Sequence, residues 1–282
     1  MNSNNISQAH IEILKISVLS VLFLILYAPT FSMFVYDWSH DDNYSHGFLV
    51  PLIAGYLVWT KRTQWQKLPA RSSLWGLAVL LGGVSIYVVG TIGAEWFSKR
   101  SSLIIVLGGL ILYLYGAEIF KSLLFPLSYL IFMVPIPAII YKTVAFQLQL
   151  FVSKIAAHII ALVGIAVYRS GNIIEIASGP LAVEEACSGM RSIMALLALS
   201  SLFAYFLYRS KLKQAILFAS ALPIAIITNV IRVTTTAIGA HYFGRQVAEG
   251  ALHESYGGVV FVIAFILLFL LSKFLDWILP GR

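Results

Sequence analysis

The chain contains little charge and almost no cysteine. Only 11% of its 282 residues are charged, whereas 60% are hydrophobic. A soluble globular domain is about half apolar and about a quarter charged, so the composition excludes a soluble enzyme, a disordered chain and a fibrous protein. The single cysteine, Cys187, excludes an internal disulfide, a cysteine-based metal cluster and a CxxC redox pair. It is either a small packing residue or a nucleophile.

Long apolar runs dominate what remains. The mean hydropathy is +0.89, and a bilayer core requires about 20 apolar residues per helix. We therefore predict an all-α polytopic membrane protein, with about eight membrane helices in a single integral membrane domain over residues 1–282. The net charge of 19 − 12 = +7 lies mostly in short loops. There it indicates topology rather than binding to nucleic acid, which we do not expect.

Two loops carry basic residues and no acidic ones, which places them on the cytoplasmic side by the positive-inside rule. One follows the apolar run 48–60, and the other precedes the run 214–240. Their cations are Lys61, Arg62, Lys67 and Arg71 in the first loop, and Arg209, Lys211 and Lys213 in the second. Alternation of the spans then places segments 168–186 and 241–256 on the outer face.

The middle of the chain is harder to assign. Segment 123–167 must contain an odd number of crossings, which we interpret as one crossing plus one helix at the outer interface, or as a re-entrant pair. Its second half carries a polar stripe at helical spacing, formed by Lys142, Thr143, Gln147, Ser153, Lys154 and His158. Beyond it, turn signals at 171–172 and 178–180 predict a short β-hairpin of residues 173–176 and 181–183. This hairpin lies on the outer face just before Cys187.

The early segment 37–47 is polar and is predicted to be a solvated loop. It contains His40, Asp41, Asp42 and His46, which are residue types that bind metals. Their spacing matches no specific metal-binding motif. We therefore expect no metal and no other cofactor.

Two polar residues fall where predicted spans reach the outer face. Cys187 precedes a helix predicted over 188–207, and the free amides and partial positive charge of a helix N-terminus favour a thiolate. Arg232 lies inside the span 214–240, with Asn229 on the same helical face. An arginine in a membrane helix is costly and usually faces a partner or a water-filled cavity.

His253, in the outer loop before the last span at 257–271, supplies a third group. A thiol, a base and a cation are the minimal parts for acyl transfer by a cysteine nucleophile, and the amides of Ser188 and Gly189 would face the developing oxyanion. Each group also has a simpler explanation, namely packing, snorkelling to the headgroups, or solvation. The alternative function is a polytopic transporter or lipid-handling membrane protein in which Arg232 binds an anionic substrate.

Three separated motifs resemble those of the exosortase/archaeosortase family. Segment 184–192 (EEACSGMRS) resembles its cysteine motif, 229–232 (NVIR) its arginine motif and 253–258 (HESYGG) its histidine motif. Segments 44–51 and 135–137 also resemble this family. The resemblance extends from about Asp37 to the last helix.

This resemblance implies a membrane-embedded cysteine protease or transpeptidase. Its nucleophile would be Cys187, its general acid/base His253, and its oxyanion- or substrate-stabilising group Arg232. Supporting residues would be Ser188, Gly189, Asn229, Glu184 and Glu185.

The resemblance also implies partners and a location. The substrates would be exported proteins with a C-terminal sorting signal made of a short motif, a membrane helix and a basic tail, as in PEP-CTERM proteins. The acyl group would pass to water or to an amine acceptor. The protein would cross the bacterial inner (cytoplasmic) membrane several times, with its active site at the periplasmic face.

Overall fold

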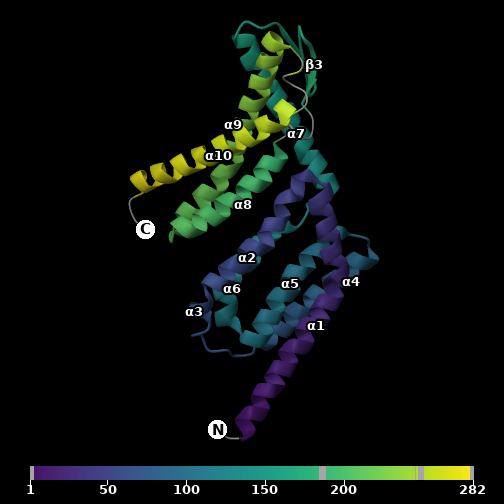
Figure 1. Cartoon of the computed structure of the whole chain (residues 1–282), viewed down its shortest axis with the longest axis vertical. Helices are drawn as coiled ribbons and strands as arrows, with labels where there is room; N and C mark the ends of the chain where they lie inside the picture. The colour runs from purple at the N-terminus through teal and green to yellow at the C-terminus, as the bar shows by residue number, and fades with distance from the viewer. Residues whose placement is uncertain (1–2, 184–188, 245, 247–250, 280–282) are drawn as a thin grey trace. The chain divides into compact units, whose positions relative to one another are not determined.

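The chain is almost entirely helical and divides into two compact units, residues 1–137 and 138–282 (Figure 1). This computed structural model describes residues 3–183, 189–244, 246 and 251–279. Within them, seven helices are long and apolar enough to cross a membrane. The predicted class, an all-α polytopic membrane protein with a small β element, is confirmed. That the whole chain forms a single domain stays a prediction.

The first unit is built from helices joined by short turns. In chain order they are α1 (Ser3–His40), η1 (Asp42–Phe48), α2 (Leu49–Thr60), α3 (Arg62–Trp65), α4 (Leu74–Ile92), α5 (Trp96–Tyr115), α6 (Ala117–Tyr129) and η2 (Leu130–Met133), where η denotes a 3-10 helix. Helices α4 and α5 pack closely because glycines lie between them. A Cβ on Gly109 would approach the backbone nitrogen of Leu80 to 2.6 Å, so the hydrogen side chain permits the contact.

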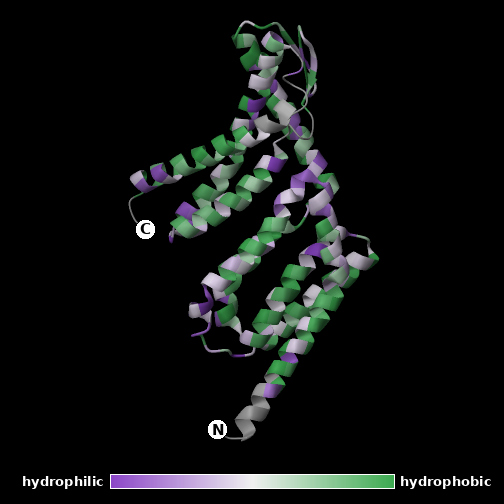
Figure 2. Cartoon of the chain, in the orientation of Figure 1, coloured by the Kyte–Doolittle hydropathy of each residue, from purple (hydrophilic) through white to green (hydrophobic). Residues whose placement is uncertain are grey.

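The second unit is a helical bundle with a small sheet. Its elements are α7 (Ala138–Leu162), β1 (Val167–Ser170), β2 (Ile173–Ile176), β3 (Gly179–Ala182), α8 (Met190–Leu207), α9 (Lys211–Phe243) and α10 (Ala251–Ile278). Figure 2 shows hydrophobic residues along most of the length of α8 and α10, whereas α9 carries hydrophilic residues within its length as well as near its ends.

The sheet is antiparallel, in the order β1-β2-β3. The predicted hairpin corresponds to β2 and β3, in which Ile173 pairs with Ala182. The strand β1 was not predicted, because only Gly164 marks a turn between the apolar helix α7 and VYRS, and the apolar residues on both sides of it look like one continuous helix. Ile174 and Ile176 of β2 are buried against α7 and α9, in a core that includes Ile160 and Val233. The sheet is thereby fixed to one end of the bundle (Figure 1).

The opposite end of this bundle is held by polar contacts. The Tyr208 hydroxyl donates to the Ser272 carbonyl at 2.7 Å, and Lys213 Nζ lies 3.2 Å from Asp276 Oδ1. The prediction that Lys213 belongs to a basic loop is therefore wrong. It lies inside α9 with 4% of its surface exposed, because Asp276 and the Tyr208 ring compensate its charge.

Segment 123–167 contains two helices separated by Val134–Pro137. The predicted polar stripe on α7 is only partly correct. Ser153 is buried and donates to the Gly171 carbonyl at 3.1 Å, so it contacts the β1–β2 turn rather than sharing the polar face. The other members of the stripe are exposed: Lys142, Thr143, Gln147, Lys154 and His158.

Candidate functional site

Arg232 lies in the interior of the second unit. Only 9% of its surface is exposed, and Asn229, one helical turn earlier on α9, is 3% exposed. Thr228 and Thr234 nearby are also buried. Burying a guanidinium and an amide in an apolar bundle costs free energy unless they are paired or hydrogen-bonded, and such groups within membrane segments commonly mark functional sites. Their burial makes this level of α9 a candidate site.

Gly189 lies directly against this level of α9. It precedes α8 with φ +83° and accepts the first helical hydrogen bond, from the Ile193 amide at 2.8 Å. A Cβ at Gly189 would lie 3.1 Å from Cγ and Nδ2 of Asn229. Glycine is favoured here both by the left-handed backbone and by the Asn229 amide packed against it.

Gly257 of α10 approaches the same arginine from another helix. A Cβ at this position would lie 3.7 Å from Nη2 and 3.8 Å from Cζ of Arg232. His253 lies about one helical turn earlier on α10, since residues four apart share a helix face. The prediction that His253 lies in a loop is wrong, because α10 already begins at Ala251.

The structure thus brings together at least one described residue from each of the three motifs. Gly189, Asn229 and Arg232 were predicted site residues and lie together. Gly257 was not singled out, although the histidine motif contains it. The predicted residues Cys187, Ser188, Glu184 and Glu185 lie outside the described residues, as does the side chain of His253. Their roles stay predictions.

Both ends of the segment that carries the cysteine are anchored. At its start, the Val183 amide donates to the Asn172 carbonyl at 2.9 Å, and Asn172 Nδ2 donates to the Val183 carbonyl at 3.1 Å. At its end, Gly189 packs on Asn229. The residues on either side of segment 184–188 are therefore fixed, Val183 by the sheet and Gly189 by α9.

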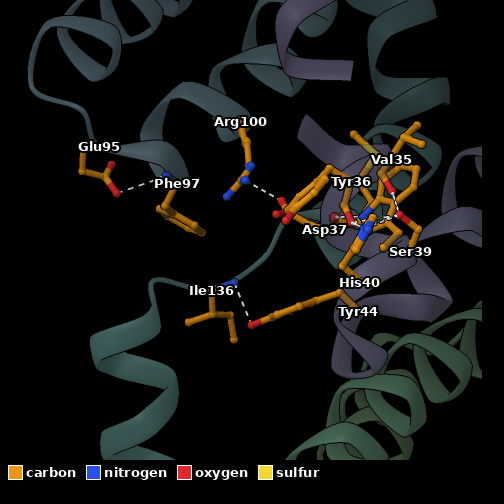
Figure 3. Close-up of polar contacts among 12 residues, drawn as sticks. Val35, Tyr36, Asp37, Ser39, His40, Tyr44, Glu95, Phe97, Arg100 and Ile136 are labelled. Atoms are coloured by element: carbon orange, nitrogen blue, oxygen red, sulfur yellow. Dashed lines mark hydrogen bonds and ion pairs between the residues drawn. The ribbon is translucent and has the colours of Figure 1, made fainter. Parts of the chain in front are cut away.

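The two remaining motif segments meet in the first unit. The Ile136 amide donates to the Tyr44 hydroxyl at 3.2 Å (Figure 3), and His46 Nε2 lies 3.2 Å from the Phe132 carbonyl oxygen. Trp38 Nε1 donates to the Met133 carbonyl at 3.0 Å. We call these contacts between 38–46 and 132–136 the clasp.

The clasp corrects the prediction of a solvated loop at 37–47. Helix α1 continues to His40 and η1 follows almost at once, because the aromatic rings of Trp38 and Tyr44 are buried and their polar atoms find partners. Burial raises the pKa of Tyr44 to about 12 and lowers that of His46. Asp37 forms an ion pair with Arg100 (Figure 3).

Within the described ranges, no group of three or more His, Cys, Asp or Glu side chains is placed to hold a metal ion. His40, for example, stacks on Tyr36 with ring centroids 4.2 Å apart.

Comparison with known proteins gives one result. No curated protein and no solved structure matches the chain. The family model described as transmembrane exosortase matches residues 38–270, a range that contains the clasp and all three motifs. The resemblance seen in the sequence is confirmed, and the chain belongs to the transmembrane exosortase family.

Proposed function

We propose that the protein is a cysteine transpeptidase that cleaves the C-terminal sorting signal of exported proteins through a thioacyl intermediate on Cys187. The observation that carries this proposal is the convergence of Gly189, Asn229, Arg232 and Gly257. Membership of the exosortase family supports a membrane-embedded sorting transpeptidase in general terms.

Chain connectivity supports the roles of the two reactive groups. Cys187 lies two residues before Gly189 in the sequence, and two residues of chain span at most about 7 Å. His253 precedes Gly257 by one helical turn, a rise of about 6 Å. A thiol, an imidazole and the Arg232 guanidinium are then expected within one small region.

The proposed reaction begins when His253 takes the thiol proton of Cys187. The thiolate attacks the scissile carbonyl, and Arg232 stabilises the oxyanion. As the C–S bond forms and the C–N bond breaks, His253 returns the proton to the leaving amine. Water or an amine acceptor then attacks the thioester, giving its proton to His253, and the thiol is regenerated when that proton returns to sulfur.

The location follows from the charge pattern. The basic segments 61–71 and 209–213 are expected on the cytoplasmic side. Arg232 follows Lys213 on α9 by a rise of about 28 Å, close to the thickness of a bilayer core. We place the site at the periplasmic face of a bacterial inner membrane, where exported proteins with a sorting signal are its substrates.

The test is processing of a tagged protein that carries a short motif, a membrane helix and a basic tail, followed on gels and by mass spectrometry. Cys187→Ala is expected to reduce cleavage to background, because no thioester can form. Arg232→Lys is expected to slow it strongly, since lysine lacks the planar fork of donors. Arg209→Lys, at an exposed position at the other end of the bundle, serves as the control.

Full processing by Cys187→Ala at normal protein levels would refute the proposal. Wild-type rates for Arg232→Lys would remove only the role of that arginine. A thiol-reactive probe separates the enzyme from a transporter, because a catalytic thiolate reacts in a pH-dependent way whereas a packing cysteine stays inert.

A further inference from the structure

A cavity of about 530 Å³ lies among the helices of the first unit. Its walls come from α1, α2, α5, α6 and η2, and every lining residue is apolar. The one polar atom of the Trp38 side chain is engaged, since its indole N–H donates to the Met133 carbonyl. The cavity therefore has no side-chain group suited to a polar ligand.

The cavity is open on the side where its lining residues on α1 are exposed, and we call this side its mouth. Helix α1 packs on η1 and α5, whereas α2 packs on η1, η2 and α6, and among the described residues α1 and α2 do not pack closely on each other. Phe31 and Val35 line the cavity and are 37% and 52% exposed. Gly55, opposite them, also lines it, and a Cβ there would meet nothing within 4 Å. Since α1 is apolar enough to cross the membrane, this mouth opens toward lipid.

The volume limits the occupant to a single chain. A water-sized group takes about 30 Å³, so the cavity holds roughly 18 methylene-sized groups, comparable to one acyl chain of a membrane lipid. A membrane helix is about 10 Å across and about 30 Å long, and it needs several times this space. The cavity is therefore too small to enclose the substrate's helix.

Cations lie at one end of the cavity. Val58 lines it, and Lys61 follows one turn later, donating Nζ to the Ser122 carbonyl at 2.8 Å. Arg62 stacks on Trp59 beside it, and no acidic residue occurs between 61 and 73. Basic groups next to an apolar cavity between membrane helices suit an anionic lipid headgroup.

We propose that the first unit binds one acyl chain of an anionic phospholipid in this cavity, with the headgroup beside Lys61 and Arg62. This site uses none of the residues assigned to peptide cleavage. Its success or failure is therefore independent of the proposed transpeptidase activity.

The test is photo-crosslinking of the full-length protein in nanodiscs that contain phosphatidylglycerol with a diazirine on its acyl chain. Label is expected on Phe34, Leu127 and Met133, which are at most 7% exposed and are reached only from inside the cavity. Leu52, which is 70% exposed, reports ordinary contact with bulk lipid.

Gly55→Leu fills the cavity without a backbone clash, and we expect it to remove the label from Phe34, Leu127 and Met133 while Leu52 stays labelled. The matched control is Gly82→Leu on α4, where a Cβ also meets nothing within 4 Å but which does not line the cavity. Label confined to Leu52 in the wild type, or equal losses in both variants, would overturn the proposal.

The headgroup is tested with the same diazirine chain on phosphatidylcholine and on a free fatty acid. Phosphatidylglycerol is expected to label the cavity residues more strongly by about fivefold per contacting cation, and Lys61→Gln should reduce that preference. Equal labelling by phosphatidylcholine, or stronger labelling by the fatty acid, would show that an anionic phospholipid is not the ligand.

Discussion

At the scale of single residues, the candidate site depends on two glycines, whose side chains are only hydrogen atoms. Gly189 lies at the start of α8, and Gly257 lies on α10. Each leaves room for a polar side chain of α9. The two glycines differ in how tightly they are confined. A Cβ on Gly189 would press on Asn229 at 3.1 Å, whereas one on Gly257 would make ordinary contact with Arg232 at 3.7 Å. Gly257 is therefore the position at which bulk can be added stepwise.

We expect Gly257→Ala to retain processing and Gly257→Leu to lose at least about tenfold, because the longer side chain covers the Arg232 guanidinium where the oxyanion would bind. Gly258→Leu is the control, since Gly258 is exposed and a Cβ there meets nothing within 4 Å. Initial cleavage rates at matched membrane levels provide the measurement. Equal rates for the two leucine variants would mean that the space beside Arg232 does not serve the reaction.

At the scale of elements, apolar periodicity and turn residues predicted most of the helices and two of the three strands. They did not predict the clasp, because its bonds join Trp38, Tyr44 and His46 to backbone atoms of residues 132–136, far along the chain. A polar sequence such as DWSHDDNYSHG looks solvated until its aromatic rings are known to be buried. Similarly, the ion pair of Lys213 and Asp276 forms because the start of α9 meets the end of α10. Such a contact between distant segments cannot be predicted from the sequence near either residue.

The clasp predicts a pH dependence of stability. Burial lowers the pKa of His46 below 6.5, so the folded state holds it neutral. The unfolded chain takes up a proton near pH 6.5, and stability is therefore lost as the pH falls through that value toward the lower folded pKa. Above it, the contribution is fully present. Thermal unfolding of the purified protein between about pH 7.5 and about pH 5 should show this decline.

His46→Gln keeps a neutral N–H donor for the Phe132 carbonyl and should flatten the decline. His40→Gln, at an exposed position on α1, should leave it unchanged. An identical pH profile for wild type and His46→Gln would show that another group controls the acid sensitivity.

At the scale of the whole molecule, the number of membrane crossings decides on which side the site lies. In the first unit, the Arg71 amide bonds the Tyr115 carbonyl, so the α5–α6 turn shares a side with the basic loop 61–71. The clasp shows that residues 132–136 have returned to the side of η1. Segment 117–133, about 25 Å of helix, therefore crosses, although α6 alone is too short to be recognised as a span.

For helix α7, hydropathy and the charges of the flanking loops give opposite indications of whether it crosses the membrane. Its length and composition suit a span, yet a crossing by α7 would place the basic segment 209–213 on the opposite side from 61–71, against the positive-inside rule. We expect α7 to remain on the outer side. The expected spans are then α1, α2, α4, α5, α6 with η2, α8, α9 and α10, which agrees with about eight predicted from the sequence. Like α6, α2 alone is shorter than a recognised span, and it is counted because it joins η1 to the basic loop 61–71.

Single-cysteine labelling tests this topology, because Cys187→Ser leaves the chain free of thiols. Ala138→Cys and Val163→Cys, at exposed positions beside the two ends of α7, should react alike with a membrane-impermeant maleimide in intact cells. Gln66→Cys and Lys211→Cys should react only in inverted vesicles. Opposite behaviour of positions 138 and 163 would mean that α7 crosses, and since α8, α9 and α10 follow it, Arg232 and the proposed catalytic site would then face the cytoplasm.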